Sequence, residues 1–487
     1  MHSSVESSLG YWEQSSLLAG PFMSMIDASV INVALPNMAS TLHSSLAGVQ
    51  WVASAYLLAL GLGTTTTAYL AKRYGTHTLY SLSLLGFTLL SGLCALAPTL
   101  GILIGARVLQ GLFGALLVPL AMNMLLGKQG ASSHMSMWAG MILFLAPAVG
   151  PALGGILIQW QGWPLIFLIN VPVGVIAFIG ARRIPLEWAY QSQEATPFDL
   201  TGFILLTSGI LSITYGASQA TSYGWLRPHV WPYWVFGILL IAGYAHWVRR
   251  TPHPIINIKI LQGNHGAISM TLMAIVSVVT FAVIILIPAY MQQVQHQTAT
   301  LAGLTLLPQG IITGLGAWLG MKLPERWGMR PTIALGMTLL TATSFGLLAV
   351  NTATQPAIIA LILCGRGFAI GFVIQPLITS LIGGLPEEMV ADGNTLFNVV
   401  ERVSGTLGIA LIVTFFQHQE ARHINQALVS VNTARLVSPA LTRRLAQAAT
   451  ASFHHTIWLI VILSMLGLCL AAWTENGKVE VPRTSDA

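Results

Sequence analysis

The sequence predicts an all-α, polytopic membrane protein, because of its composition, its long apolar runs and the placement of its basic residues. Of the 487 residues, 54% are hydrophobic and only 7% are charged. Soluble domains carry about a quarter charged residues. A surface this poor in charge would not be stable in water, so we expect most of it to face lipid.

Apolar runs long enough to cross a bilayer recur along the chain. A membrane-spanning helix needs about 20 apolar residues, and roughly fourteen such segments can be counted, six in each half and two between the halves. They begin near Leu17, Leu46, Thr78, Leu100, Met135, Pro164, Leu200, Val230, Gly266, Leu301, Pro331, Ala357, Thr395 and Thr456.

The basic residues predict the orientation of these spans. Lys and Arg accumulate in short cytoplasmic loops, and most of them fall inside if the amino terminus is inside. Both termini are therefore predicted to be cytoplasmic, in a plasma membrane. The segment from Met1 to Gln14 contains no Lys or Arg, so we expect the first helix to remain as an uncleaved anchor.

The span count predicts three parts. They are a six-helix half over residues 1–185, two inserted helices with their linkers over 186–260, and a second six-helix half over 261–487. A long polar loop near 419–453 falls on the outside and has the pattern of amphipathic surface helices. It either contacts a partner, such as a periplasmic adaptor protein, or simply caps the exit.

The remaining composition excludes other classes of protein. The basic residues form no stripe or dense cluster, so no nucleic acid is expected as a partner. Cys94, Cys364 and Cys469 all lie in apolar runs and behave as small hydrophobic residues. Neither a disulfide framework nor a metal site is predicted. No nucleotide loop or nucleophile with a base stands out, so an enzyme is not predicted, and no cofactor is implied.

Two internal similarities relate the halves. The loop Leu70–Gly75 resembles the loop Leu323–Gly328, and each follows the second helix of its half. Arg107 in the fourth helix has a counterpart in Arg366. Many transporters are built from two related halves around a central site.

Five segments in order carry a family resemblance. They are Ile26–Pro36, Arg107–Gly111, Pro147–Gly155, Phe167–Pro172 and Phe198–Gly202. Together they resemble the motifs of the major facilitator superfamily and, within it, the fourteen-helix drug:proton antiporters. This resemblance implies the major facilitator fold and multidrug efflux across a bacterial inner membrane, with antibiotic resistance as the outcome. Lipophilic, cationic compounds would leave in exchange for protons by alternating access between the halves.

The resemblance also implies conformational roles for the two related loops. The family pattern places an acid that latches the halves together at the position of Lys72, with Arg73 and Gly75 following. The second copy keeps an acid at Glu325, followed by Arg326 and Gly328. The substitution at Lys72 puts the usual inner latch in doubt.

Small residues in the fifth span form the segment that the family associates with antiport. Gly150, Pro151, Gly154 and Gly155 permit close backbone approach and a local kink. In the family this segment limits leak in the substrate-free protein. Plain helix packing is the alternative.

Charged groups within the spans are candidates for proton coupling. Each costs at least about 2.5 to 3.5 kcal/mol on insertion scales, so a functional role is the default hypothesis. Asp27 and Arg107 lie at similar depths and can pair if their helices pack together. The alternatives are a proton-linked switch or a static pair that orders the bundle. Glu401 is either a second titratable site or a solvated interfacial residue.

Aromatic and amide side chains of the central spans are candidates for the substrate cavity, since ring faces and dipoles attract lipophilic cations. Packing is the alternative for each of them. Arg366 is expected to mirror Arg107 structurally, because no mid-membrane acid faces it. The predicted cavity residues are Asn32, Trp51, Tyr56, Gln110, Tyr290, Gln309 and Gln375.

Two other functions stay open. The same scaffold suits a proton-linked exporter of one metabolite, lipid or siderophore. A membrane sensor or scaffold without transport is the alternative from another class, and Lys72 in place of the loop acid gives it some support.

Overall fold

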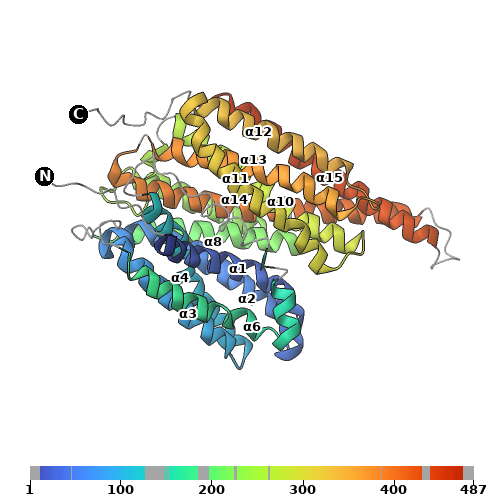
Figure 1. Cartoon of the computed structure of the whole chain (residues 1–487), viewed down its shortest axis with the longest axis horizontal. Coiled ribbons are helices and arrows are strands. Elements are labelled where there is room, and N and C mark those ends of the chain that lie inside the picture. The colour runs from blue at the N-terminus through green and yellow to red at the C-terminus, as the bar shows by residue number, and fades with distance from the viewer. Residues whose placement is uncertain are drawn as a thin grey trace. The chain divides into compact units, whose positions relative to one another are not determined.

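The computed structural model describes residues 11–44, 46–126, 149–150, 153–184, 197–223, 227–261, 264–383, 385–429 and 439–474. Within these ranges the regular structure is helical (Figure 1). The chain divides into two compact units, residues 1–198 and 199–487. The predicted fold class of an all-α protein therefore holds in both units.

The helices of the first unit follow the predicted spans. Residues 153–161 are also helical and belong to the predicted fifth span. The sixth span consists of two short helices that meet at Ile169. The backbone of Ile169 is itself helical, with φ of −59° and ψ of −29°. The helices are α1 (Tyr11–Thr41), α2 (Leu46–Tyr74), α3 (Thr76–Ala95), α4 (Leu100–Leu126), α6 (Pro164–Leu168) and α7 (Asn170–Ala181).

The second unit contains the predicted inserted pair together with the second half. The three-part division of the chain stays a prediction. The helices are α8 (Leu200–Tyr223), α9 (Trp231–Val248), η3 (Ile258–Leu261), α10 (Asn264–Gln293), α11 (Ala299–Trp327), α12 (Met329–Gly346), η4 (Leu347–Ala349), α13 (Pro356–Ile382), α14 (Glu387–Val429) and α15 (Pro439–Ala471).

Ten helices in the described part of the chain are long and apolar enough to cross a membrane. Helices α1, α2 and α9 also lie where spans are predicted but are not among these ten. The fifth predicted span lies partly outside the described residues. The described helices are thus those of a protein that crosses the membrane many times. The count of fourteen spans stays a prediction.

Asp199 explains why the Phe198–Gly202 segment begins a helix. Its Oδ1 accepts hydrogen bonds from the backbone N–H of Gly202 at 2.8 Å and from Nε1 of Trp247 at 2.9 Å. The first contact caps the N-terminus of α8, and the second joins it to the end of α9. The Asp199 carboxylate therefore forms hydrogen bonds with both inserted helices.

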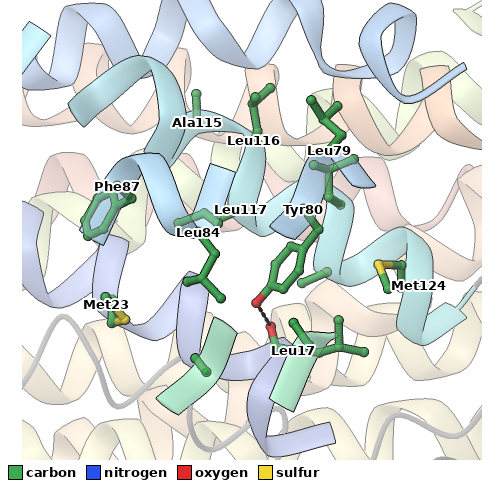
Figure 2. Packing of buried hydrophobic residues seen from close by; sticks show 14 of the residues in the cluster. Leu17, Met23, Leu79, Tyr80, Leu84, Phe87, Ala115, Leu116, Leu117 and Met124 are labelled. Carbon is green, nitrogen blue, oxygen red and sulfur yellow. Dashed lines mark hydrogen bonds between the residues drawn. The ribbon is translucent and has the colours of Figure 1, made fainter. Parts of the chain in front are cut away.

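The apolar core of the first unit includes one polar anchor. Tyr80 on α3 is fully buried, and its hydroxyl donates to the carbonyls of Ser16 and Leu17 on α1, at 3.0 and 2.8 Å. Figure 2 shows Leu84, Leu117 and their neighbours packed around it. A hydroxyl in an apolar region needs such partners, so Tyr80 fixes how α3 lies against α1.

The two related loops have the same backbone geometry. Gly75 joins α2 to α3 with φ of 79°, and Gly328 joins α11 to α12 with φ of 89°. Side chains disfavour this left-handed region, so glycine is required at both turns. The internal repeat seen in the sequence is thus repeated in local structure.

Glycines bring α2 against α4 and α11 against α13 at backbone distance. A Cβ added to Gly111 would lie 2.6 Å from the carbonyl oxygen of Tyr56, and one added to Gly371 would lie 2.0 Å from that of Thr313. Only glycine leaves room for such contacts. The second and fourth helices of each half therefore pack by the same principle.

The residues expected to form an outer loop with surface helices are mostly continuations of two long helices. Helix α14 runs to Val429 and α15 begins at Pro439, and their ends reach beyond the other helices of the second unit (Figure 1). The physical reason is helix propensity, since this stretch is rich in Ala, Gln, Leu and Arg. Polar composition predicts a loop over these residues, but it does not exclude a helix that extends beyond the bilayer.

Candidate functional site

An ion pair between Asp27 and Arg107 lies at the centre of the first unit. Arg107 Nη1 donates to Oδ2 of Asp27, and both side chains are fully buried. The acid comes from the middle of α1 and the arginine from α4. A buried pair costs desolvation energy, and removing one partner leaves an uncompensated charge. Each of the two buried charges therefore depends on the other for compensation.

The guanidinium of Arg107 makes further contacts with three helices. Its Nε donates to the Val52 carbonyl at 3.2 Å, and Nη1 also donates to Oε1 of Gln110 at 2.8 Å. Its Cζ lies 3.9 Å from the ring centroid of Tyr56 and 5.3 Å from that of Phe167. Rings on α2 and α6 thus add cation–π attraction to the hydrogen bonds.

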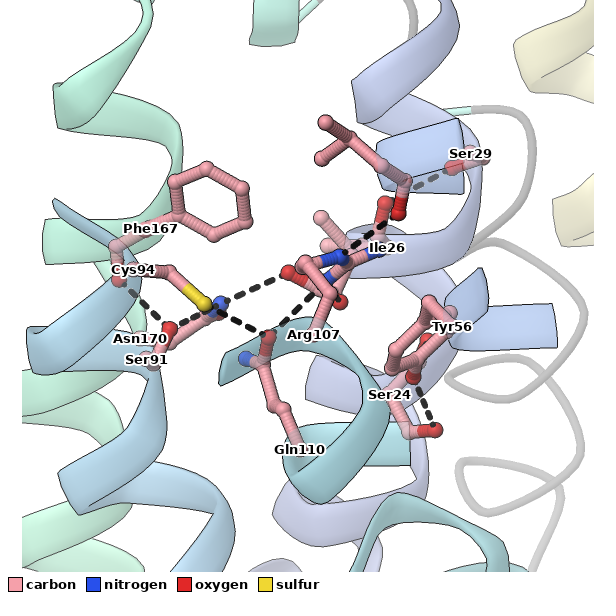
Figure 3. A network of polar contacts seen from close by, with 12 residues as sticks. Ser24, Ile26, Ser29, Tyr56, Ser91, Cys94, Arg107, Gln110, Phe167 and Asn170 are labelled. Atoms are coloured by element: carbon pink, nitrogen blue, oxygen red, sulfur yellow. Dashed lines mark hydrogen bonds and ion pairs between the residues drawn. The ribbon is translucent and has the colours of Figure 1, made fainter. Parts of the chain in front are cut away.

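The second oxygen of Asp27 is held from the opposite side. Asn170 Nδ2 donates to Oδ1 of Asp27 at 3.4 Å and to Oγ of Ser91 at 3.1 Å. Ser91 in turn donates to the Phe167 carbonyl at 2.9 Å. Figure 3 shows these residues converging from several helices. Neither Asn170 nor Ser91 was singled out from the sequence as a site residue.

Two N–H donors of this network lack an acceptor among the described residues. They are Nη2 of Arg107 and Nε2 of Gln110. The Gln110 side chain already accepts from Arg107 and from Sγ of Cys94, the latter at 3.5 Å. A buried donor without an acceptor costs free energy, so this network is only partly satisfied in the described structure.

The fifth-span glycines contact the helix that carries the acid. A Cβ added to Gly150 would lie 1.8 Å from Oγ of Ser29, and one added to Gly154 would lie 2.6 Å from Cγ2 and 3.2 Å from the carbonyl oxygen of Val30. These contacts lie two or three residues beyond Asp27. This segment therefore packs directly against the helix of the carboxylate.

The geometry is that of a membrane protein with a charged pair buried inside one half. A model of the Major Facilitator Superfamily matches residues 17–409. The chain belongs to the major facilitator superfamily. Membership makes it a multi-pass membrane transporter and not an enzyme.

Individual relatives are named as multidrug resistance or multidrug export proteins. The chain is 33% identical over 409 residues to a multidrug resistance protein B homologue from Mycobacterium tuberculosis, covering 82% of this chain and 74% of that protein. It is 26% identical over 477 residues to the multidrug export protein EmrB from Escherichia coli, covering 95% and 92%.

A solved structure of the superfamily is similar in fold. It is a bacterial homologue of the human lysosomal transporter Spinster, crystallised in an inward-facing and unoccupied conformation. The match has a TM-score of 0.55 with 16% sequence identity and covers 95% of this chain and 98% of that chain.

The predicted conformational residues lie at helix ends and turns. Lys72 is half-buried near the end of α2, and Arg73 is exposed and donates to the Tyr69 hydroxyl at 2.8 Å. Glu325 and Arg326 are exposed on α11. Their roles as superfamily latches stay a prediction. Pro151 lies outside the described residues, and Gly155 has open space around it.

The predicted cavity residues differ in exposure. Trp51 is 44% exposed, whereas Tyr56 and Gln110 are buried within the Arg107 network. In the second unit, Tyr290 is buried and stacks on Phe453 with 4.3 Å between ring centroids. Its hydroxyl lies 3.0 Å from Oγ1 of Thr450. The remaining positions are Gln309 and Gln375, both buried, and Asn32, whose side chain lies outside the described residues.

Glu401 is half-buried on α14 in the second unit and is followed by half-buried Arg402. Asn398, one turn earlier, donates to the Asn394 carbonyl at 2.8 Å on its own helix. The structure gives Glu401 no surroundings comparable to those of Asp27. Its assignment to proton coupling stays a prediction.

Asn170→Ala is expected to slow transport by about threefold to tenfold, because Asp27 loses a hydrogen bond. The loss is limited because this bond, at 3.4 Å, is long for a charged acceptor. The measurement is the initial rate of substrate uptake into proteoliposomes. Ser83→Ala is the matched control, since Ser83 is a buried α3 serine that donates only to Leu79 of its own helix. Equal rates for Asn170→Ala and Ser83→Ala would contradict a positioning role for Asn170.

Proposed function

We propose that this transporter is a proton-coupled antiporter that exports lipophilic, cationic compounds by alternating access. The observation that carries the proposal is the fully buried ion pair of Asp27 and Arg107. A carboxylate inside the bilayer can exist with or without a proton, whereas arginine stays charged. Protonation of Asp27 therefore changes the net charge of the site by one.

The contacts of the pair suggest how this change moves helices. Protonation removes the counter-charge of Arg107, which is also bonded to Val52 on α2 and Gln110 on its own helix. An uncompensated buried charge is costly, so the network favours another arrangement of α1, α2 and α4. The contact of Gly150 and Gly154 with Ser29 and Val30 would transmit that shift.

Competition for one negative charge would couple the two fluxes. A cationic compound and a proton both neutralise Asp27, so binding of one favours release of the other. Tyr56, whose ring already lies against the Arg107 guanidinium, offers a face that also suits an organic cation. The relatives named as a multidrug resistance protein and a multidrug export protein support drugs as the cargo.

The placement in the cell is supported by the distribution of basic residues and by the bacterial relatives. We propose the inner membrane of a bacterium, with both termini cytoplasmic and the far ends of α14 and α15 on the outer side. In that orientation these helix ends either contact a periplasmic adaptor or cap the exit. Labelling of single cysteines from outside the cell would test the orientation, and labelling of residues 439–443 from inside would contradict it.

Transport by the purified protein in proteoliposomes tests the proposal. With an acidic lumen, we expect accumulation of ethidium, a lipophilic cation, together with a rise in lumenal pH. Collapse of the pH gradient by nigericin is expected to abolish the accumulation. Ethidium uptake that is insensitive to nigericin would exclude proton coupling.

The other functions give different results in the same assay. A narrow exporter would ignore ethidium but show counterflow with one compound from a panel of metabolites, lipids and siderophores. A sensor or scaffold would move neither ethidium nor protons with any compound.

A further inference from the structure

A second buried arginine lies at the centre of the second unit. Arg366 on α13 is fully buried. Its Nη1 donates to Oγ of Ser344 on α12 at 2.7 Å, and its Nη2 donates to the carbonyl of Val279 on α10 at 2.9 Å. Its Nε has no acceptor among the described residues.

In contrast to Arg107, Arg366 forms no ion pair with any residue that the structure describes. Its two acceptors are a neutral hydroxyl and a carbonyl. Arginine does not lose its charge in proteins, and a charge inside the bilayer without a counter-charge is costly. The local structure therefore favours the arrival of an anion.

The first unit shows what is missing around Arg366. Ser91 and Ser344 each lie sixteen residues after the left-handed glycine that precedes their helix, Gly75 or Gly328. Ser91 belongs to the network around Asp27 and Arg107, and Ser344 contacts Arg366. The serine of the site is thus present in both halves.

The acid of the site is present in only one half. Asp27 contacts Arg107 from α1, the first helix of its half, whereas α10, the first helix of the second half, contacts Arg366 through the Val279 carbonyl. Thr280 directly follows Val279, whose carbonyl accepts from Arg366. The Thr280 hydroxyl is buried and has no partner among the described residues. The second half therefore repeats the charged site without its carboxylate.

We propose that Arg366, Ser344 and Thr280 form a binding site for the carboxylate of a lipophilic acid. The ligand would supply the group that Asp27 supplies in the first half. A planar guanidinium matches the two oxygens of a carboxylate, and a hydroxyl donor beside it adds a further bond. The site deepens the proposed function, because it extends the cargo from cations to amphiphilic anions.

Equilibrium binding of radiolabelled decanoate tests the site. The protein is held in phosphatidylcholine nanodiscs in HEPES buffer free of chloride and of other carboxylates, with empty nanodiscs as the background. We expect saturable decanoate binding by the unaltered chain. Arg366→Gln is expected to weaken it by about tenfold or more, since a charge-assisted hydrogen bond is lost.

A second substitution keeps the test decisive if Arg366→Gln fails to fold. Thr280→Asp keeps the arginine and gives it an internal carboxylate, so decanoate affinity is again expected to fall about tenfold or more. Thr343→Ala is the matched control, because Thr343 precedes Ser344 and donates only to Leu339 and Leu340 of its own helix. Unchanged decanoate binding by monodisperse Thr280→Asp would overturn the assignment.

Two further arms separate the sources of negative charge. Chloride that binds at Arg366 without being displaced by decanoate would overturn the choice of a carboxylate. Loss of decanoate binding in nanodiscs of phosphatidylglycerol would likewise show that an acidic lipid headgroup is the preferred ligand. Decanol, which has no charge, is expected to bind equally to the unaltered chain and to Arg366→Gln.

Failure of this proposal is distinguishable from failure of proton coupling, because the binding assay contains no pH gradient. Ethidium antiport without Arg366-dependent decanoate binding would remove the anion site and leave the proposed function standing. Decanoate binding without ethidium antiport would leave the anion site standing and remove the proposed proton coupling.

Discussion

Asp27→Asn is expected to abolish proton-driven ethidium transport while the protein still folds and inserts. The amide keeps an oxygen that accepts from Arg107, but it can neither carry a negative charge nor exchange a proton. Loss of the counter-charge in a buried pair is costly, yet the hydrogen bonds from Arg107 to Val52 and Gln110 remain. We expect uptake driven by the pH gradient to fall to the level of empty liposomes, because the amide cannot exchange a proton.

The controls separate charge from packing at this position. Asp27→Glu keeps a titratable group and is expected to retain part of the activity. Asp199→Asn removes a different acid, whose two Oδ1 hydrogen bonds an asparagine oxygen can also accept, and it loses only the long 3.3 Å hydrogen bond from the Ile255 N–H. It is expected to transport normally. Full proton-driven transport by Asp27→Asn would rule out coupling through this carboxylate.

Gly371→Ala is expected to give the largest loss of stability of any single methyl addition in the second unit. The new Cβ would lie 2.0 Å from the Thr313 carbonyl oxygen and 2.7 Å from the Ala317 nitrogen. Both are backbone atoms, so α11 and α13 must separate. Overpacking of this kind costs about 1 to 3 kcal/mol or more. The apparent melting temperature in detergent should fall by several degrees, with a lower yield of monodisperse protein.

Gly346→Ala on α12 provides the comparison for this experiment. Its added Cβ would lie 3.5 Å from Cγ2 of Ile362, which is an ordinary contact. Both substitutions add the same methyl group to a helix of the same unit. If the two variants had the same apparent melting temperature, the glycine contact between α11 and α13 would not determine stability.

The order of the helices is largely predictable from the sequence because hydropathy and helix length are local properties. Predicted spans begin at Leu46, Leu100, Pro164 and Leu200, where helices or membrane segments begin in the structure. The last predicted span begins near Thr456, although α15 starts at Pro439. Hydropathy detects only the part of a helix that lies in lipid, so it misses such polar extensions.

The candidate site was only partly predictable. Asp27 and Arg107 stand out because charge inside an apolar run is rare. Asn170 and Ser91 carry no such signal, since neutral polar side chains occur in many membrane helices. Their contacts depend on how α3 and α7 pack, with Gly174 of α7 placed against Thr88 of α3. Only the tertiary structure supplies that information.

The contrast between Arg107 and Arg366 shows a second limit of sequence reasoning. Both arginines are visible as charges in apolar runs, and the absence of an acid near Arg366 suggested a structural mirror. The structure adds that Ser344 repeats the position of Ser91 and that α10 contacts Arg366 at Val279, next to Thr280, whose buried hydroxyl has no partner among the described residues. The missing carboxylate near Arg366 is recognisable only by comparing its surroundings with those of Arg107 in the structure.

The extended ends of α14 and α15 have a practical consequence for imaging. Helix α14 contains 43 residues, which corresponds to about 65 Å at 1.5 Å per residue, roughly twice the thickness of the hydrocarbon core. A transporter buried in a detergent micelle usually offers few features for particle alignment. An antibody fragment raised against the α14 extension would give electron cryomicroscopy a rigid marker on the second unit.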